Sequence, residues 1–158
     1  MGRRIKRVLS GLGFIAAAMA VAFKAMSLAG QAPVRPEAPT SLPACPDSPN
    51  CVGSRPGEDA VHSIAPFHFS GDPATALDRL QQVAVADGGR LVRANGKYVH
   101  LEYCSRIFGF VDDVEFLLSS EPGRIEVRSA SRSGHSDLGV NRRRVERLRA
   151  RFQEVMVP

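Results

Sequence analysis

The sequence has few aromatic residues and no surplus of charge in its main body. Only 6% of the 158 residues are aromatic, and none is tryptophan. The formal net charge is +5, but residues 1–44 hold six basic residues and one acidic residue, so residues 45–158 hold 15 of each sign. A nucleic-acid surface needs clustered cations and, for single strands, aromatic stacking platforms. The basicity belongs to the first 44 residues, and we expect no nucleic-acid partner.

Cysteine is scarce as well, and its spacing does not match a zinc site. The three cysteines are Cys45, Cys51 and Cys104. The first two lie farther apart than the roughly two to four residues that separate paired zinc ligands, and the sequence has no second pair. The four histidines show no ligand spacing either. We therefore expect no metal and no other cofactor.

The heptapeptide CPDSPNC, which begins at Cys45, favours a tight loop. Its prolines and its Asp and Asn residues are typical of turns. In an oxidising compartment Cys45 and Cys51 can close this loop as a disulfide, and we predict that they do. Two free thiols in a reducing cytosol are the alternative. Cys104 lies in a predicted strand, where a cysteine is usually a small buried apolar group, so we expect a buried free thiol.

Residues 1–29 have the pattern of an export leader. Four cations at positions 3, 4, 6 and 7 precede an uncharged apolar run, Val8–Phe23. Such a run partitions into the bilayer while its flanking cations stay in the cytoplasm, so the chain that follows is exported. Two fates are open. Residues 1–29 are a signal peptide cleaved after Ala29, or residues 8–28 are a single-pass anchor in the inner membrane.

Residues 30–44 are expected to form a linker, because they contain four prolines and little that could pack. This linker would hold a domain of residues 45–158 at the periplasmic face of the membrane. The expected partners are the membrane itself, through the N-terminal segment, and an envelope protein or a lipid.

The pattern of residues 45–158 predicts one α+β domain. Its clearest element is a helix that has Asp72 as its cap and ends at Gly88, and a second helix begins near Asn141. Strands are expected at residues 61–69, 90–94, 97–104, 108–118 and 124–129. The order is then β-α-β-β-β-β-α. We predict an antiparallel sheet of about five strands with two helices packed on one face.

The stretch FVDDVEF places two aspartates in an apolar run. Side chains in a strand alternate between faces, so Asp112 falls on the buried face, while Asp113 and Glu115 fall on the other. The two aspartates therefore do not form a carboxylate pair. We expect Asp113 and Glu115 to be solvated. Asp112 should be ionised and paired, with Arg132 or Arg142 as its leading partners, because a carboxylate on an apolar face needs a partner.

A polar loop, SRSGHSDLGVNRRR, leads into the last helix and concentrates groups that could line a site. Helix N-terminal amides can hold an anion there, and arginines at the start of a helix oppose its dipole and favour an acidic partner. The alternative is a structural network of ion pairs that joins this loop and helix to the neighbouring strand. The candidate residues for binding a ligand or partner are Asp112, Arg132, His135, Ser136, Asp137, Asn141 and Arg142.

Three stretches together resemble the bacterial and plastid family called domain of unknown function 1499. They are CPDSPNCVGS (45–54), FVDDVEF (110–116) and SASRSGHSDLGVNRRRVERLR (129–149), and they occur in the family's order. The resemblance spans residues 45–152. It implies an uncharacterised domain that often follows a membrane or export leader, and it carries over no catalytic residues. The matching motif positions are Cys45, Pro46, Asn50, Cys51, Asp112, Asp113, Arg132, Ser136, Asp137, Asn141 and Arg142.

Three functions are open from the sequence. The leading hypothesis is a non-catalytic envelope module that binds a protein or assembles with a membrane complex. The second is a carrier that holds an apolar small molecule or lipid in a pocket between sheet and helices. The third is a hydrolase that uses residues 132–142, although Ser136 lies in no nucleophile motif. The chain has no mechanism-bearing motif, so we expect a binding role rather than catalysis.

Overall fold

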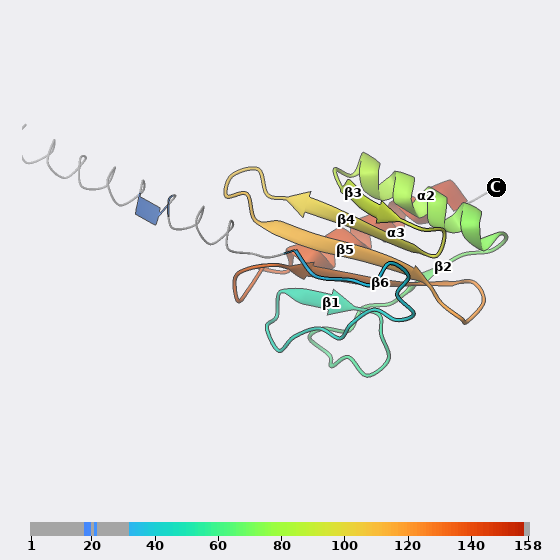
Figure 1. Ribbon diagram of the computed structural model, residues 1–158, viewed down its shortest axis with the longest axis horizontal. Helices are drawn as coiled ribbons and strands as arrows, with labels where there is room; N and C mark the ends of the chain where they lie inside the picture. The colour runs from blue at the N-terminus through green and yellow to red at the C-terminus, as the bar shows by residue number, and fades with distance from the viewer. Residues whose placement is uncertain (1–17, 20, 22–31, 157–158) are drawn as a thin grey trace, which may run out of the picture.

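The structure, a computed structural model, describes residues 18–19, 21 and 32–156 (Figure 1). The three isolated residues, Ala18, Met19 and Val21, are helical. The predicted signal peptide or anchor otherwise lies outside the described residues. Among the residues that are described, no helix combines the length and the apolar character needed to cross a membrane.

Six strands form one antiparallel sheet, and two helices cover one of its faces (Figure 1). The strands are β1 (Cys51–Gly53), β2 (Phe67–His68), β3 (Arg90–Ala94), β4 (Tyr98–Cys104), β5 (Val111–Leu118) and β6 (Arg124–Ser131). Their order in the sheet is β1-β6-β5-β4-β3, and β2 also pairs with β6. The helices are α2 (Pro73–Ala86) and α3 (Val140–Met156). The predicted α+β class and element order are confirmed.

Helix α2 begins and ends where its sequence predicts. The Asp72 carboxylate accepts hydrogen bonds from the backbone N–H and the hydroxyl of Thr75, both at 2.8 Å. The helix stops just before Gly88, whose φ of 105° is open mainly to glycine. Gly89 is required for a different reason. A Cβ atom at this position would lie 2.9 Å from the carbonyl oxygen of Ala84, which is too close.

A close-packed apolar core fills the space between the sheet and the helices. Phe67 of β2 lies edge-to-face against Phe116 of β5 and Phe152 of α3, with ring centroids 5.5 and 5.8 Å apart. Leu80 of α2 and Leu148 of α3 are completely buried in the same cluster. Aromatic and aliphatic side chains from both helices and the sheet therefore hold the two layers together.

One two-residue strand and one isolated bridge take the place of the strand predicted at residues 61–69. Phe67–His68 of that stretch forms β2, which pairs with the start of β6. Before it, the chain forms a loop with one isolated bridge between Ser63 and Gly53. The sequence pattern did not indicate β1, because a strand of three residues is too short to show a two-residue hydrophobic period.

The proline-rich residues 33–42 lie along the outer face of the sheet, opposite the helices, and we call them the covering segment (Figure 1). Leu42 is 2% exposed and packs with Tyr98 of β4 and Leu117 of β5. The guanidinium of Arg93 donates to the carbonyl oxygen of Pro36 at 2.9 Å. Composition predicts an extended linker here, but it gives no sign that the linker packs against the domain.

Replacing Leu42 by alanine should lower the free energy of unfolding by about 2 kcal/mol, because the change removes a buried side chain between the covering segment and the sheet. Urea unfolding of the full chain measures the loss. Val34 in the same segment is exposed, so Val34→Ala is the matched control and should stay within about 0.5 kcal/mol of the parent. Equally small effects of both substitutions would contradict the packing of the covering segment.

Candidate functional site

The adjacent aspartates of β5 point to opposite faces of the sheet. Asp112 faces the helices and bonds to Arg144 of α3. Asp113 faces outward and bonds to Arg132 and His100. The alternation predicted for this strand is confirmed, and the two carboxylates do not act as a pair. Each belongs to its own polar cluster.

The inner cluster is centred on a buried ion pair. Arg144 Nη2 donates to Asp112 Oδ2 at 2.5 Å. Arg144 Nη1 also donates to Asn141 Oδ1 at 2.6 Å and to Ser129 Oγ at 3.2 Å. The guanidinium lies over the ring of Tyr103, 4.5 Å from its centroid. These contacts neutralise a carboxylate that would otherwise be strongly unfavourable on an apolar face.

The partner of Asp112 is Arg144, and not Arg132 or Arg142 as expected from the sequence. The buried residues of α3 are Asn141, Arg144, Val145, Leu148 and Phe152. These positions recur every three or four residues, so Arg144 faces the sheet together with Asn141. Arg142 points elsewhere and donates to the carbonyl oxygen of Val61 at 2.8 Å.

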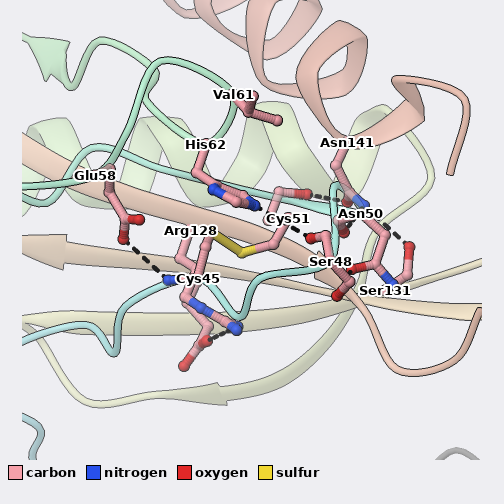
Figure 2. Close-up of a disulfide and its surroundings, with 12 residues drawn as sticks. Cys45, Ser48, Asn50, Cys51, Glu58, Val61, His62, Arg128, Ser131 and Asn141 are labelled. Atoms are coloured by element: carbon pink, nitrogen blue, oxygen red, sulfur yellow. Dashed lines mark hydrogen bonds and ion pairs between the residues drawn. A yellow bond between two sulfur atoms is a disulfide. The ribbon is translucent and has the colours of Figure 1, made fainter. Parts of the chain in front are cut away.

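The disulfide loop joins the inner cluster through Asn50 (Figure 2). The disulfide predicted between Cys45 and Cys51 is present. The carbonyl oxygen of Asn50 accepts the side-chain N–H of Asn141 at 2.9 Å and the backbone N–H of Ser131 at 3.0 Å. The three stretches that carry the sequence resemblance therefore meet at one buried cluster.

The outer cluster begins at Asp113, on the face that the sequence pattern assigns to solvent. Both Nε and Nη2 of Arg132 donate to Asp113 at 2.8 Å, and the His100 ring nitrogen Nε2 lies 2.7 Å from it. Arg132 also forms an ion pair with Glu102 of β4. The expectation that Asp113 is solvated is wrong, because it is 3% exposed. Arg132, the residue that follows β6, permits a carboxylate to be buried there.

Glu115 extends the outer cluster beneath the covering segment. It is 0% exposed, so the expectation of a solvated side chain is wrong here too. Arg35 of the covering segment donates to both of its oxygens, at 2.7 and 3.0 Å. The hydroxyl of Tyr98 donates at 2.7 Å, and Arg128 of β6 donates at 3.3 Å. Strand alternation places Glu115 on the outer face correctly, but it does not show what covers that face.

Both outer carboxylates are held ionised by their partners. Burial raises the pKa of Asp113, but the hydrogen bonds from Arg132 and His100 and the positive charge of Arg132 together outweigh it and hold the pKa below its usual value. Burial likewise raises the pKa of Glu115, and the hydrogen bonds from Arg35 and Tyr98, together with the charges of Arg35 and Arg128, bring it below the usual value. A general acid or base needs a pKa near the working pH. These two groups are instead fixed acceptors at neutral pH.

The loop between β6 and α3 holds most of the remaining candidate residues. Asp137 accepts the backbone N–H of Asn141 at 2.7 Å, so it caps α3 in the role that the sequence pattern gives to Asn141. His135 and Ser136 are exposed. The Ser136 hydroxyl accepts the N–H of Leu138 at 3.3 Å. The hydrogen bonds of Ser136 and Asp137 therefore serve the conformation of the loop itself and the start of the helix.

The seven candidate residues lie in three different places rather than in one site. Asp112 and Asn141 belong to the inner cluster, Arg132 belongs to the outer cluster, and His135, Ser136, Asp137 and Arg142 belong to the loop and the first turn of α3. Sequence reasoning missed Arg144 and Ser129. Counting in helical steps from Asn141 would have found Arg144, whereas nothing in the pattern marks Ser129.

Cys104 is exposed, and the prediction of a buried thiol is wrong. It is the last residue of β4, and alternation along this strand turns it to the outer face, opposite α2 and α3. Within residues 32–156, no group of three or more His, Cys, Asp or Glu side chains is arranged to hold a metal ion.

An apolar hollow of about 410 Å³ lies between the covering segment and the turn that joins β5 to β6. Its lining includes Pro39, Phe69, Leu117, Leu118 and Pro122. A hollow of this volume and character is within the range of small-molecule sites. It lies outside the core between the sheet and the helices.

Replacing Asp112 by alanine should destabilise the protein by about 3–5 kcal/mol, because Arg144 would stay buried without its charge partner. Urea unfolding measures the loss. Asp78 is an exposed residue of α2, and Asp78→Ala should stay within about 0.5 kcal/mol of the parent. The double variant Asp112→Leu/Arg144→Met removes both charges and should be more stable than Asp112→Ala. An Asp112→Ala protein as stable as Asp78→Ala would show that the pair is solvated.

The free energy of unfolding should fall as the pH drops below about 4. The pKa values of Asp113 and Glu115 are lowered in the folded protein, so their contribution is complete above the unfolded pKa values and is lost as the pH falls through the folded ones. Urea unfolding at a series of pH values measures the slope. Glu115→Gln removes one titrating group and should weaken the dependence. Stability that is unchanged between about pH 5 and pH 3 would rule out this contribution.

One family of known proteins matches almost the whole domain. No curated protein matches the chain. A family model described as "Protein of unknown function (DUF1499)" matches residues 41–152. This range includes the disulfide loop, both aspartates of β5 and the residues of α3 that complete the inner cluster. The match covers most of the chain, so the protein belongs to the DUF1499 family.

Proposed function

We propose that this protein is a non-catalytic binding module of the bacterial envelope, held at the periplasmic face of the inner membrane by its N-terminal segment. The observation that supports this role best is that the charged side chains of the sequence motifs bond to other residues of the domain. Asp112 bonds to Arg144, and Asp113 bonds to Arg132. Because these groups neutralise each other inside the domain, they specify its architecture and leave recognition to the surface.

The compartment is supported by two independent features. The leader pattern of residues 1–29 favours export. The disulfide between Cys45 and Cys51 suits an oxidising environment such as the periplasm, where disulfides form and persist.

The edge of the sheet at β3 is the surface that best suits a protein partner. β3 is the last strand in the sheet order, and most of its residues are exposed. Leu91 and Val92 are 41% and 44% exposed, so apolar surface accompanies the strand edge. An extended segment of another envelope protein can add to such an edge as one more strand. The register shift between Leu91 and Arg93 limits unspecific pairing with other edges.

A second candidate function is supported by the apolar hollow beside the covering segment. Its volume of about 410 Å³ would accept a small apolar ligand or part of a lipid tail. Mass spectrometry of organic extracts from the purified protein tests this role, and a lipid recovered in stoichiometric amount would favour it over the protein-binding role.

A photoreactive amino acid at Val92 should crosslink the full chain to one envelope protein in living cells, because strand addition brings the partner against β3. Immunoblots and mass spectrometry of the membrane fraction identify the adduct. The same amino acid at Gln153, an exposed position of α3, is the control and should give no such adduct.

Leu91→Lys in the crosslinking protein should abolish the adduct, since a lysine on an edge strand opposes strand addition. An adduct that survives this change, or that forms equally from Gln153, would overturn the assignment of the β3 edge as the binding surface.

A further inference from the structure

Two loops at one end of the sheet present apolar side chains to solvent. The β4–β5 loop covers residues 105–110, and the β6–α3 loop covers residues 132–139. They lie at the same end, because Cys104 pairs with Val111 and the backbone N–H of Arg132 donates to the Val111 carbonyl oxygen at 3.0 Å. In Figure 1 both loops are on the left, where the described chain begins at residue 32.

One apolar side chain in each loop is turned almost fully outward, and a second in the β4–β5 loop is partly exposed. Ile107 and Leu138 are each 84% exposed, and Phe108 is 38% exposed. Leu138 has a φ of 54°, a left-handed conformation that is unfavourable for residues other than glycine. Folding of the domain does not need a leucine at an exposed position of this kind. Contact with an apolar surface outside the protein would bury these side chains and account for their presence in both loops.

Cations accompany the exposed apolar groups. The β4–β5 loop, SRIFGF, contains Arg106 and no acidic residue. Arg143 is exposed at the start of α3, and its guanidinium donates to the carbonyl oxygen of Leu138 at 2.8 Å. The carboxylate of Asp137 in the other loop is turned to the backbone of α3. Apolar tips beside arginines match a membrane interface, where apolar side chains reach the acyl boundary and arginines contact lipid phosphates.

The length of the chain before residue 32 favours a bilayer over a protein as the occupant. The apolar run Val8–Phe23 ends eight residues before Gln31, which directly precedes the described range 32–156. Eight residues can span at most about 28 Å even when fully extended. With the apolar run in the membrane, this end of the domain is therefore held close to the lipid, and weak contacts to the bilayer become effective at such a local concentration.

We propose that the β4–β5 and β6–α3 loops dip into the membrane interface, with Ile107, Phe108 and Leu138 among the lipids and Arg106 and Arg143 at their phosphates. The proposal rests on the membrane tether of the proposed function. It adds an orientation: these two loops face the bilayer, and the β5–β6 turn and the apolar hollow lie at the end of the domain away from the membrane.

The native thiol of Cys104 offers a probe for this orientation, because it is exposed and adjoins the β4–β5 loop. The full chain, labelled at Cys104 with a polarity-sensitive fluorophore, is reconstituted into phosphatidylcholine–phosphatidylglycerol vesicles that contain lipids with a nitroxide near the headgroup. The control is Cys104→Ser/Glu121→Cys, which carries the fluorophore on the β5–β6 turn at the opposite end of the sheet.

The expected result is emission at shorter wavelength, with several-fold stronger nitroxide quenching, from the label at Cys104 than from the label at position 121. Ile107→Ser/Leu138→Ser should return the Cys104 label to the quenching of the control, and it should leave the fold intact because both side chains are exposed. Equal quenching of the two labels in protein that floats with the vesicles would overturn the orientation alone. Loss of the protein from floated vesicles would overturn the membrane tether, and the orientation with it.

Discussion

The buried ion pair between Asp112 and Arg144 decides how helix α3 lies on the sheet. Apolar packing alone tolerates shifts, because aliphatic side chains can be exchanged or repacked with modest loss. A charged pair in the core does not tolerate such shifts, since a buried guanidinium without its carboxylate would cost several kcal/mol of stability. Only the helix register that brings Arg144 to β5 is therefore stable. The same register places Asn141 against the disulfide loop and Phe152 in the core.

The two faces of the sheet are buried by different means. The helix-covered face carries an apolar core with one cluster of polar groups at its edge. The outer face carries Asp113, neutralised by Arg132 just after β6, and Glu115, neutralised by Arg35 of the covering segment. Arg35 precedes the region matched by the family model, which begins at residue 41. This chain thus closes its charged face with a segment of its own that lies ahead of the matched domain.

Local signals predicted much of this architecture. The cap at Asp72 and the strand periods of residues 90–118 gave α2 and three adjacent strands, because these elements are long enough to show their patterns. Alternation along β5 also separated Asp112 from Asp113 correctly. The predictions that failed concern residues whose environment is set by contacts distant in the sequence. Glu115 is buried by Arg35, which is 80 residues away, and strand alternation holds no information about such a partner. Arg144 was missed because it was not counted onto the buried face of α3 that Val145, Leu148 and Phe152 mark.

The course of the covering segment has a mechanical consequence. It runs along the sheet, so tension applied at residue 32 would act first on the bidentate contact between Arg35 and Glu115. If that contact and the Leu42 packing break, residues 35–44 can detach and extend to at most about 35 Å end to end. The extension then stops at Cys45, which the disulfide ties to β1 and so to the sheet. Under tension the non-covalent contacts of the covering segment would therefore break before the sheet is pulled, and the disulfide would keep the chain from being stripped from β1 beyond Cys45.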